Sequence, residues 1–262
     1  MAHLLNVWPS VRARLGRADR VLLLFDYDGT LTPIVARPED AVLPGEVRRL
    51  LRSLAAHPRY ASGIVSGRSL DDLSTLADVP GLILAGNHGM EIRGQGMDFV
   101  HPGAVAARGV LDEVESGLVD ALGDVPGVIV EHKGLTLSVH YRTVAAQNAP
   151  AIESAVSAVA SPYVDRGEIR LTRGKKVIEA RPNISWDKGR AIEKIREECG
   201  DAPLPVYFGD DRTDEDGFRV VQAMGGVAVF VGEPREGTVA LHQLDSPGEV
   251  EETMRLLVEE GS

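Results

Sequence analysis

The stretch VLLLFDYDGTLTPIV, residues 21–35, contains the two features that decide the fold. Five apolar residues, Val21 to Phe25, form a run that is typical of a strand buried on both faces of a sheet. Two carboxylates, Asp26 and Asp28, follow directly. Like charges at the end of a core strand are unfavourable unless a cation neutralises them, so the segment predicts a site as well as a strand. A plain loop cap built on the Asp-Gly dipeptide is the alternative interpretation.

The composition is that of an ordinary globular protein. The chain has 262 residues, of which 44% are apolar and 26% charged, so it can form one large domain or two small ones. A net charge of −11 and an aromatic content of 5% argue against a nucleic-acid partner. The single cysteine, Cys199, and the absence of a long apolar segment predict a cytoplasmic protein with no membrane partner. We further expect it to be a monomer.

Strand and helix patterns alternate in the first third of the chain and return in the last. Residues 43–57 place Val47, Leu50, Leu51 and Leu54 on one helical face. Further apolar runs at 61–65, 81–85 and 204–208 read as strands, and the segments between them read as helices. This alternation predicts an α/β fold with a parallel sheet covered by helices.

The middle of the chain has a different pattern. Residues 127–142 contain two β-rich runs around a glycine, 148–163 form an Ala-rich helical pattern, and 168–182 contain two strands joined by a tight turn at Arg173-Gly174. The sequence therefore predicts an α+β module at 92–181, inserted into an α/β domain formed by 1–91 and 182–262.

Reactive side chains stand at three predicted strand ends, where ligands bind in open parallel sheets. Besides Asp26 and Asp28 these are Ser66 and the pair Asp210 and Asp211. Converging carboxylates of this kind suit Mg²⁺ together with a phosphate. Ser66 fits both a strand-ending turn and a phosphate cradle at a helix start. Lys188 fits both an exposed helical lysine and the fixed cation that an anion site needs.

Four short motifs make the chain resemble the haloacid dehalogenase phosphatase superfamily. They are DYDGT (26–30), SGR (66–68), WDKG (186–189) and GDDRTDED (209–216), in that order. Further segments in both the α/β domain and the insert are similar to the trehalose-phosphatase family; they are GNHGMEI (86–92), EHKGLTLSVHYR (131–142) and GKKVIEARPNISWDKGRAI (174–192). His132 and Gly217 depart from that family's usual residues.

The resemblance implies a haloacid dehalogenase-like Rossmannoid core with an inserted α+β cap domain that selects the substrate. It implies Mg²⁺-dependent hydrolysis of trehalose 6-phosphate, the last step of trehalose biosynthesis, through an aspartyl-phosphate. In this assignment Asp26 is the nucleophile and Asp28 the acid/base, while Ser66 and Lys188 bind the phosphoryl oxygens. The implied metal set is Asp26, Asp28 through its main-chain carbonyl, Asp210, Asp211 and Asp214, the last two acting through water or by orienting Lys188. The implied substrate-binding residues are Thr30, Gly67, Arg68, Asn87, His88, Glu131, Lys133, His140, Arg142, Lys175 and Glu179.

Three other functions share part of this pattern. One is a phosphatase for another sugar phosphate, such as sucrose-phosphate or mannosyl-phosphoglycerate, and the cap sequence argues against it. Another is a receiver-type signalling domain, which lacks both a cap and an acid/base two residues after the phosphorylated aspartate. The third is a silent sugar-phosphate-binding regulator, and the intact set of Asp26, Asp28, Lys188 and Asp210 argues against it.

Overall fold

A computed structural model describes residues 1–261 and divides them into two compact units. The core unit comprises Met1–Phe99 and the chain from Trp186 onward, and the insert unit comprises Val100–Ser185. The sequence placed the boundaries at 92 and 181. They lie later in the chain because β5 (Glu91–Gly94) and β6 (Met97–Val100) extend the sheet of the core unit.

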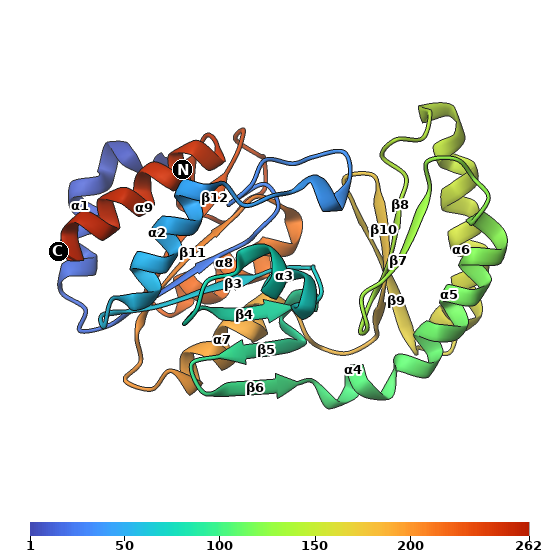
Figure 1. Ribbon diagram of the computed structural model, residues 1–262, viewed down its shortest axis with the longest axis horizontal. Helices are drawn as coiled ribbons and strands as arrows, with labels where there is room; N and C mark the ends of the chain where they lie inside the picture. Colours follow the sequence, from blue (N-terminus) through green and yellow to red (C-terminus); the bar gives the residue numbers. More distant parts are fainter. Residues whose placement is uncertain (262) are drawn as a thin grey trace. The chain divides into compact units, whose positions relative to one another are not determined.

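The core unit is built on a nine-stranded sheet with the order β1-β13-β12-β11-β2-β3-β4-β5-β6. The part from β3 through β4 and β5 to β6 can be followed in Figure 1. Adjacent strands from β1 through β4 run parallel, and β5 pairs with β4 in the antiparallel sense. The remaining strands are β1 (Ala2–His3), β2 (Val21–Phe25), β3 (Tyr60–Val65), β4 (Ile83–Gly86), β11 (Leu204–Gly209), β12 (Val227–Val231) and β13 (His242–Leu244). The helices are α1 (Trp8–Gly16), α2 (Gly45–Ala56), α3 (Leu70–Ala77), α7 (Lys188–Glu198), α8 (Glu215–Ala223) and α9 (Pro247–Gly261), with 3₁₀ turns η1 (Leu5–Val7), η2 (Pro38–Asp40), η3 (Asn87–Gly89) and η5 (Arg212–Asp214).

Strand β2 lies in the middle of this sheet, and its side chains are buried on both faces as the sequence predicted. Alternate residues face opposite sides of a strand. Leu23 packs in the cluster that contains α1, α2 and α9, whereas Leu22 and Leu24 pack in the cluster that contains α7 and α8. The apolar run of the sequence is therefore explained by helices on both sides.

The register of β2 with its neighbours aligns the strand ends that carry reactive residues. Phe25 pairs with Phe208 of β11 on one side and with Ile64 of β3 on the other. The residues that follow these pairs along the chain include Asp26, Asp210 and Ser66. Parallel pairing thus places the three predicted strand-end groups at one edge of the sheet.

The insert unit is a four-stranded antiparallel sheet with the order β7-β8-β10-β9. Leu137 and Val139 of β8 and Ile178 of β10 pack in one apolar cluster with residues of α5 and α6. The elements are α4 (Pro102–Ala106), α5 (Arg108–Leu122), β7 (Ile129–His132), β8 (Leu137–His140), η4 (Ala146–Asn148), α6 (Ala149–Asp165), β9 (Ile169–Gly174) and β10 (Val177–Pro182).

The turn between β9 and β10 differs from the predicted one. Gly174 pairs with Val177, so the two-residue turn consists of Lys175 and Lys176 and not of Arg173-Gly174. Lys176 adopts a φ of +63°, a conformation that a lysine tolerates less readily than a glycine. The glycine suggested a turn at Gly174, but the residue with left-handed backbone is Lys176, two positions later.

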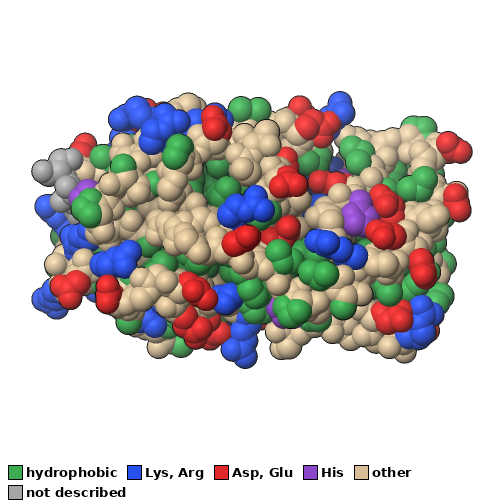
Figure 2. All heavy atoms as spheres, turned by 60° about the horizontal axis from the view of Figure 1, so that its bottom comes forward, with side chains coloured by type: hydrophobic (Ala, Val, Ile, Leu, Met, Phe, Trp, Pro, Cys, Tyr) green, Lys and Arg blue, Asp and Glu red, His purple; other side chains and the backbone are tan. Residues whose placement is uncertain are grey.

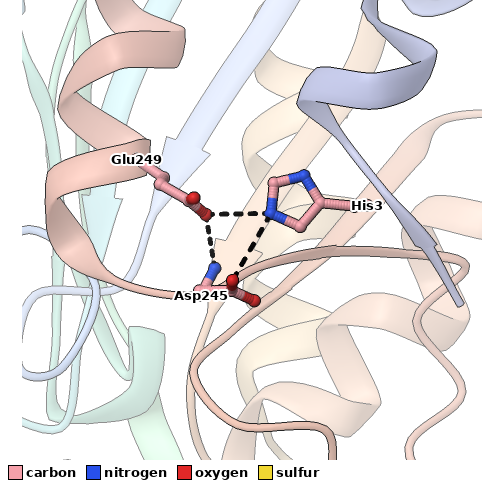
Figure 3. A group of neighbouring side chains, drawn as sticks. All are labelled: His3, Asp245 and Glu249. Atoms are coloured by element: carbon pink, nitrogen blue, oxygen red, sulfur yellow. Dashed lines mark hydrogen bonds and ion pairs between the residues drawn. The ribbon is translucent and has the colours of Figure 1, made fainter.

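The first strand is fastened to the start of the last helix by a small charged cluster (Figure 3). The Nε2 atom of His3 lies 3.1 Å from Oε2 of Glu249 and 3.8 Å from Oδ2 of Asp245. The backbone N–H of Asp245 also donates to Oε2 of Glu249, at 2.6 Å. These contacts join β1 to the start of α9, in addition to the parallel pairing of β1 with β13.

Charged side chains of both signs are interspersed over the face of the molecule shown in Figure 2.

Among the described residues, no helix combines the length and the apolar character needed to cross a membrane.

Removing one core side chain should destabilise the core unit measurably. Leu23→Ala should lower the free energy of unfolding by about 2–5 kcal/mol, because it leaves a cavity in a fully buried cluster. Both tryptophans, Trp8 and Trp186, belong to the core unit, so their fluorescence during urea unfolding reports on it. Leu241→Ala is the matched control, since Leu241 is 62% exposed, and it should change stability little. Equal effects of the two substitutions would contradict the assigned packing.

Candidate active site

Asp26 stands at the carboxyl end of β2 and is held on both its backbone and its side chain. Its backbone N–H donates to the carbonyl of Phe208 at 2.8 Å, which continues the pairing with β11 by one residue. Its Oδ1 atom accepts a hydrogen bond from Nζ of Lys188 at 2.7 Å, and the residue is only 5% exposed. The carboxylate is therefore a fixed, buried group rather than a solvated loop cap.

Lys188 is the first residue of α7, and the structure decides between its two interpretations. The side chain of Asp187 caps this helix by accepting from the N–H of Arg190 at 2.9 Å, which turns Lys188 toward the sheet. Its Nζ donates to Asp26 and to Oδ1 of Asp214, both at 2.7 Å, and the side chain is 3% exposed. Lys188 is a buried cation and not a solvated helical lysine.

The pKa of Lys188 depends on two opposing effects, burial and the neighbouring carboxylates. Burial alone would lower the pKa, but the carboxylates of Asp214 and Asp26 outweigh burial and raise it above its ordinary value. Lys188 therefore stays charged at neutral pH.

Asp214 has all four of its acceptor positions occupied. Its Oδ1 accepts from Lys188 and from the Tyr207 hydroxyl, and its Oδ2 accepts from the backbone N–H groups of Asp210 at 3.0 Å and Asp211 at 2.9 Å. Gly209 is required beside it, because a Cβ there would collide with the Asp214 side chain. The geometry makes Asp214 the group that orients Lys188.

Tyr207 is a member of this network that the sequence did not single out. It lies on β11 with its ring fully buried, and its hydroxyl donates to Asp214. Burial, followed by the negative charges of Asp214 and Asp26, raises its pKa well above the ordinary value, so the hydroxyl keeps its proton. The available signal was a tyrosine within a buried strand, since a buried hydroxyl needs a partner.

Asp210 and Asp211 are adjacent in sequence but have different surroundings. Asp210 is 8% exposed at the end of β11, and its carboxylate lies against Gly29, whose φ is +92° and where a Cβ would collide with it. The side chain of Asp211 accepts from the N–H of Asp214 and so caps η5. Of this pair, only Asp210 directs its carboxylate toward the loop that follows β2.

The buried acids fit a hard divalent cation. Ligand oxygens of Asp26, Asp210 and Asp214 lie within 4.8 Å of one another, and the Lys188 ammonium contacts two of these carboxylates, Asp26 and Asp214. Burial raises the pKa of Asp26 well above its usual value; Lys188 opposes this rise, and the neighbouring carboxylates add to it. Oxygen donors with an excess of buried negative charge are the environment that Mg²⁺ neutralises. Because Asp214 is saturated, Asp26 and Asp210 are the carboxylates suited to hold it.

Asp28 lies two residues after Asp26, but its carboxylate contacts Arg68, whereas that of Asp26 contacts Lys188. Both of its oxygens accept from the guanidinium of Arg68, each at 2.7 Å. Arg68 also donates to Asp72 at 2.6 Å and to the carbonyl of Pro38 at 2.9 Å. Arg68, which the resemblance implied to be a substrate ligand, is thus engaged with protein groups.

Ser66 and the residues around it form a tightly tied loop after β3. The Ser66 hydroxyl accepts from the N–H of Arg68 at 3.2 Å, and its carbonyl accepts from the N–H of His88 at 2.8 Å. Asn87 and His88 follow β4 with positive φ values of 48° and 57°. A Cβ on Gly67 would come within 2.8 Å of the His88 ring, so this position needs a glycine. Left-handed, non-glycine residues next to a reactive loop are a mark of a functional site.

Thr30 completes the loop that begins at Asp26. It is fully buried, and its hydroxyl oxygen has no hydrogen-bond partner among the described residues. A buried hydroxyl in this condition is unusual, and it suits a hydrogen bond to a bound ligand.

The implied substrate residues of the insert unit fall into two groups. Glu131, Lys133, His140 and Glu179 form a charged cluster: Nε2 of His140 lies 2.7 Å from Oε2 of Glu131, and Nζ of Lys133 lies 3.5 Å from Oε1 of Glu179. Glu179 alternates along β10 with Ile178 and Ala180, which pack against the helices, so it lies on the opposite face of the sheet. Arg142 and Lys175 stand apart, where Arg142 donates to the carbonyl of Lys175 at 2.9 Å.

Comparisons with known proteins identify the family and the fold. The model of the family described as Trehalose-phosphatase matches residues 24–245. Trehalose 6-phosphate phosphatase RA3 of Zea mays is 36% identical over 95% of this chain and 72% of its own length, and the trehalose-phosphate phosphatase of Mycobacterium marinum is 39% identical over 93% and 64%. The solved C-terminal domain of the Candida albicans trehalose-6-phosphate phosphatase superposes with a TM-score of 0.83 at 26% identity and covers 96% of both chains. A haloacid dehalogenase-like hydrolase from Bacteroides thetaiotaomicron, 17% identical with a TM-score of 0.64, shares the fold.

The first three of these proteins are named as phosphatases, and the comparisons confirm the predicted enzyme class, the haloacid dehalogenase-like α/β fold and the predicted family. The chain belongs to the trehalose-phosphatase family.

Proposed function

We propose that this enzyme hydrolyses trehalose 6-phosphate to trehalose and phosphate through an aspartyl-phosphate on Asp26, with Mg²⁺, as the last step of trehalose biosynthesis. The proposed reaction at Asp26 is supported by two contacts of Lys188. Its Nζ lies 2.7 Å from Asp26 and 2.7 Å from Asp214, and so joins the two carboxylates. A buried carboxylate held in one orientation at a strand end is what in-line attack on phosphorus requires.

In the first step an Asp26 oxygen attacks the phosphorus while the bond to the sugar oxygen breaks, and Asp28 gives that oxygen a proton. In the second step Asp28 takes a proton from water, whose oxygen displaces Asp26 from phosphorus and releases phosphate. Lys188 has three N–H donors and uses two on carboxylates, which leaves one for a phosphoryl oxygen. Ser66 supplies a further hydroxyl from the adjacent loop.

Asp26 and Asp210 would hold Mg²⁺, with the main-chain carbonyl of Asp28. When bound, the ion would neutralise the negative charge of the carboxylates and of the phosphoryl oxygens. Asp214 and Tyr207 keep Lys188 aligned, and Asp211 fixes the backbone that presents Asp210.

We assign recognition of the sugar to the insert unit, acting as a cap. Its charged cluster of Glu131, Lys133, His140 and Glu179 offers both donors and acceptors, which the many hydroxyls of a disaccharide require. Lys175 lies in the β9–β10 turn, and Arg142, after β8, donates to its carbonyl; we expect a weaker contribution from these two residues.

The substrate assignment is tested by phosphate release with Mg²⁺ from trehalose 6-phosphate, sucrose 6-phosphate, mannosyl-phosphoglycerate and glucose 6-phosphate. We expect trehalose 6-phosphate to be strongly preferred. Metal-dependent activity that favours another substrate would retain the chemistry and overturn the substrate. Absence of activity on all four would instead support a sugar-phosphate-binding regulator.

Asp26→Asn should reduce turnover by roughly 10³-fold or more, because the amide cannot form the aspartyl-phosphate. Steady-state phosphate release measures the loss, and circular dichroism should show an unchanged fold. Asp216→Asn serves as the control, since that carboxylate pairs with Arg219 at 2.6 Å on the surface. Substantial Mg²⁺-dependent turnover in the Asp26 variant would remove it as the nucleophile.

EDTA should abolish activity, and added Mg²⁺ should restore it. Asp210→Asn should raise the Mg²⁺ concentration for half-maximal activity by about tenfold or more, because it removes one of two suited carboxylates. Asp211→Asn is the matched control, as its carboxylate faces the η5 backbone, and it should shift the Mg²⁺ requirement far less. Identical Mg²⁺ titrations for the two variants would refute this division of roles.

Glu131→Ala and Glu179→Ala should each lower kcat/KM for trehalose 6-phosphate by roughly 10- to 100-fold, because each removes a charged acceptor for sugar hydroxyls. Hydrolysis of p-nitrophenyl phosphate, which has no sugar, should change little. Glu168→Ala is the control within the same unit, since that side chain pairs with exposed Arg166. Equal losses on both substrates would place the two glutamates outside sugar recognition.

A further inference from the structure

We infer that Arg68 is a positioning residue for Asp28 and not a ligand of the substrate phosphoryl group. The inference rests on the proposed function, in which Asp28 is the acid/base. It concerns a residue that the family resemblance had placed on the substrate side of the site, and the contacts in the structure assign it elsewhere.

The two side chains meet through a two-pronged contact. Nε of Arg68 donates to Oδ2 of Asp28 and one terminal nitrogen donates to Oδ1, both at 2.7 Å. Two parallel hydrogen bonds fix the plane of a carboxylate as well as its distance. The Arg68 side chain is 8% exposed and that of Asp28 is 41% exposed, so the buried partner holds the accessible one.

Arg68 is itself held from several sides. Its second terminal nitrogen donates to Asp72 in the first turn of α3 at 2.6 Å, and the first also donates to the carbonyl of Pro38 at 2.9 Å. The guanidinium lies over the ring of Tyr27, 5.1 Å from its centroid. The Tyr27 hydroxyl in turn donates to the carbonyl of Ala41 at 2.8 Å, and its ring is fully buried. The contact is therefore anchored to α3, to η2 and to the loop after β2.

The donor count argues against a phosphoryl ligand. A guanidinium has five N–H donors, and four of those of Arg68 are directed at Asp28, Asp72 and Pro38. Two carboxylates already neutralise its charge, so a phosphoryl dianion would have to displace one of them. Lys188, which has a donor left, meets that need instead.

The contact also suits what Asp28 does in the proposed reaction. When one Asp28 oxygen carries the proton for the sugar oxygen, the other can still accept from the guanidinium. Arg68 can thus keep the acid/base oriented in both steps. It also joins Asp28 to the loop of Ser66, because the Arg68 backbone N–H donates to the Ser66 hydroxyl.

The decisive experiment separates turnover from phosphate binding. We expect Arg68→Gln to lower kcat for trehalose 6-phosphate by roughly 10- to 100-fold, because a misplaced acid/base costs rate. The KM and the inhibition constant of inorganic phosphate should stay within about twofold, since no phosphoryl contact is lost. A weakening of phosphate inhibition by about tenfold or more would make Arg68 a phosphoryl ligand and overturn the inference.

A double-mutant comparison provides the second readout. In an Asp28→Asn background, measured by single turnover with excess enzyme, Arg68→Gln should change the rate by less than about twofold, because the group that it positions is gone. A further loss equal to that in the wild type would overturn the inference.

Two more variants complete the design. Arg68→Lys keeps the charge and the long stem but loses the second prong, and it should show the same pattern if the glutamine variant fails to fold. Arg190→Gln, on the exposed pair with Glu193, is the matched control and should leave kcat unchanged. An inactive wild type would refute the proposed function, whereas an active wild type with additive variants would refute only the role of Arg68.

Discussion

The active site depends on one buried ammonium placed between two carboxylates. Lys188 comes from the start of a helix, Asp26 from the end of the central strand, and Asp214 from a turn after a third element. Each group would be costly to bury alone, so the three are stable in this position only together. The contact also constrains the surroundings: glycines at 29 and 209 leave room for the acids, and a buried tyrosine hydroxyl fills the last acceptor position.

Most of the fold follows from local patterns in the sequence. The run from Val21 to Phe25 predicted a strand covered on both sides. The one valine and three leucines at 47–54 predicted the buried face of α2. The predicted insert began at residue 92, inside β5, and so included β6 as well. Only Ile92 of β5 is buried, so it is pairing with β4 that places them in the large sheet. This pairing is local, with Gly86 opposite Glu91, but one buried side chain leaves the strand without an apolar pattern that would identify it.

The acidic segment 209–216 shows why the site was predictable only in part. The motif indicates where the site lies in the sequence. It does not indicate which contacts each of its acidic side chains makes. Asp210 faces the loop after β2, Asp214 orients a lysine, and Glu215 is buried where it holds Arg235 at 2.5 Å. A helix start favours acids for its dipole alone, so spacing cannot separate these uses. Arg68 shows a similar ambiguity, since a cation beside a predicted phosphate loop suits a ligand role, whereas its contact with Asp28 depends on the fold.

The pairing of the central strand has a consequence for how the protein is made. Strand β2 pairs with β11, so Leu204 to Phe208 must be synthesised before the middle of the large sheet can close around Val21 to Phe25. The insert unit, in contrast, is one uninterrupted stretch of chain whose sheet needs no residue outside 129–182. During translation the insert can complete its sheet first, while Asp26 still belongs to a segment whose sheet has not formed. A ribosome that stops between the two events would leave a folded module attached to an unassembled catalytic centre.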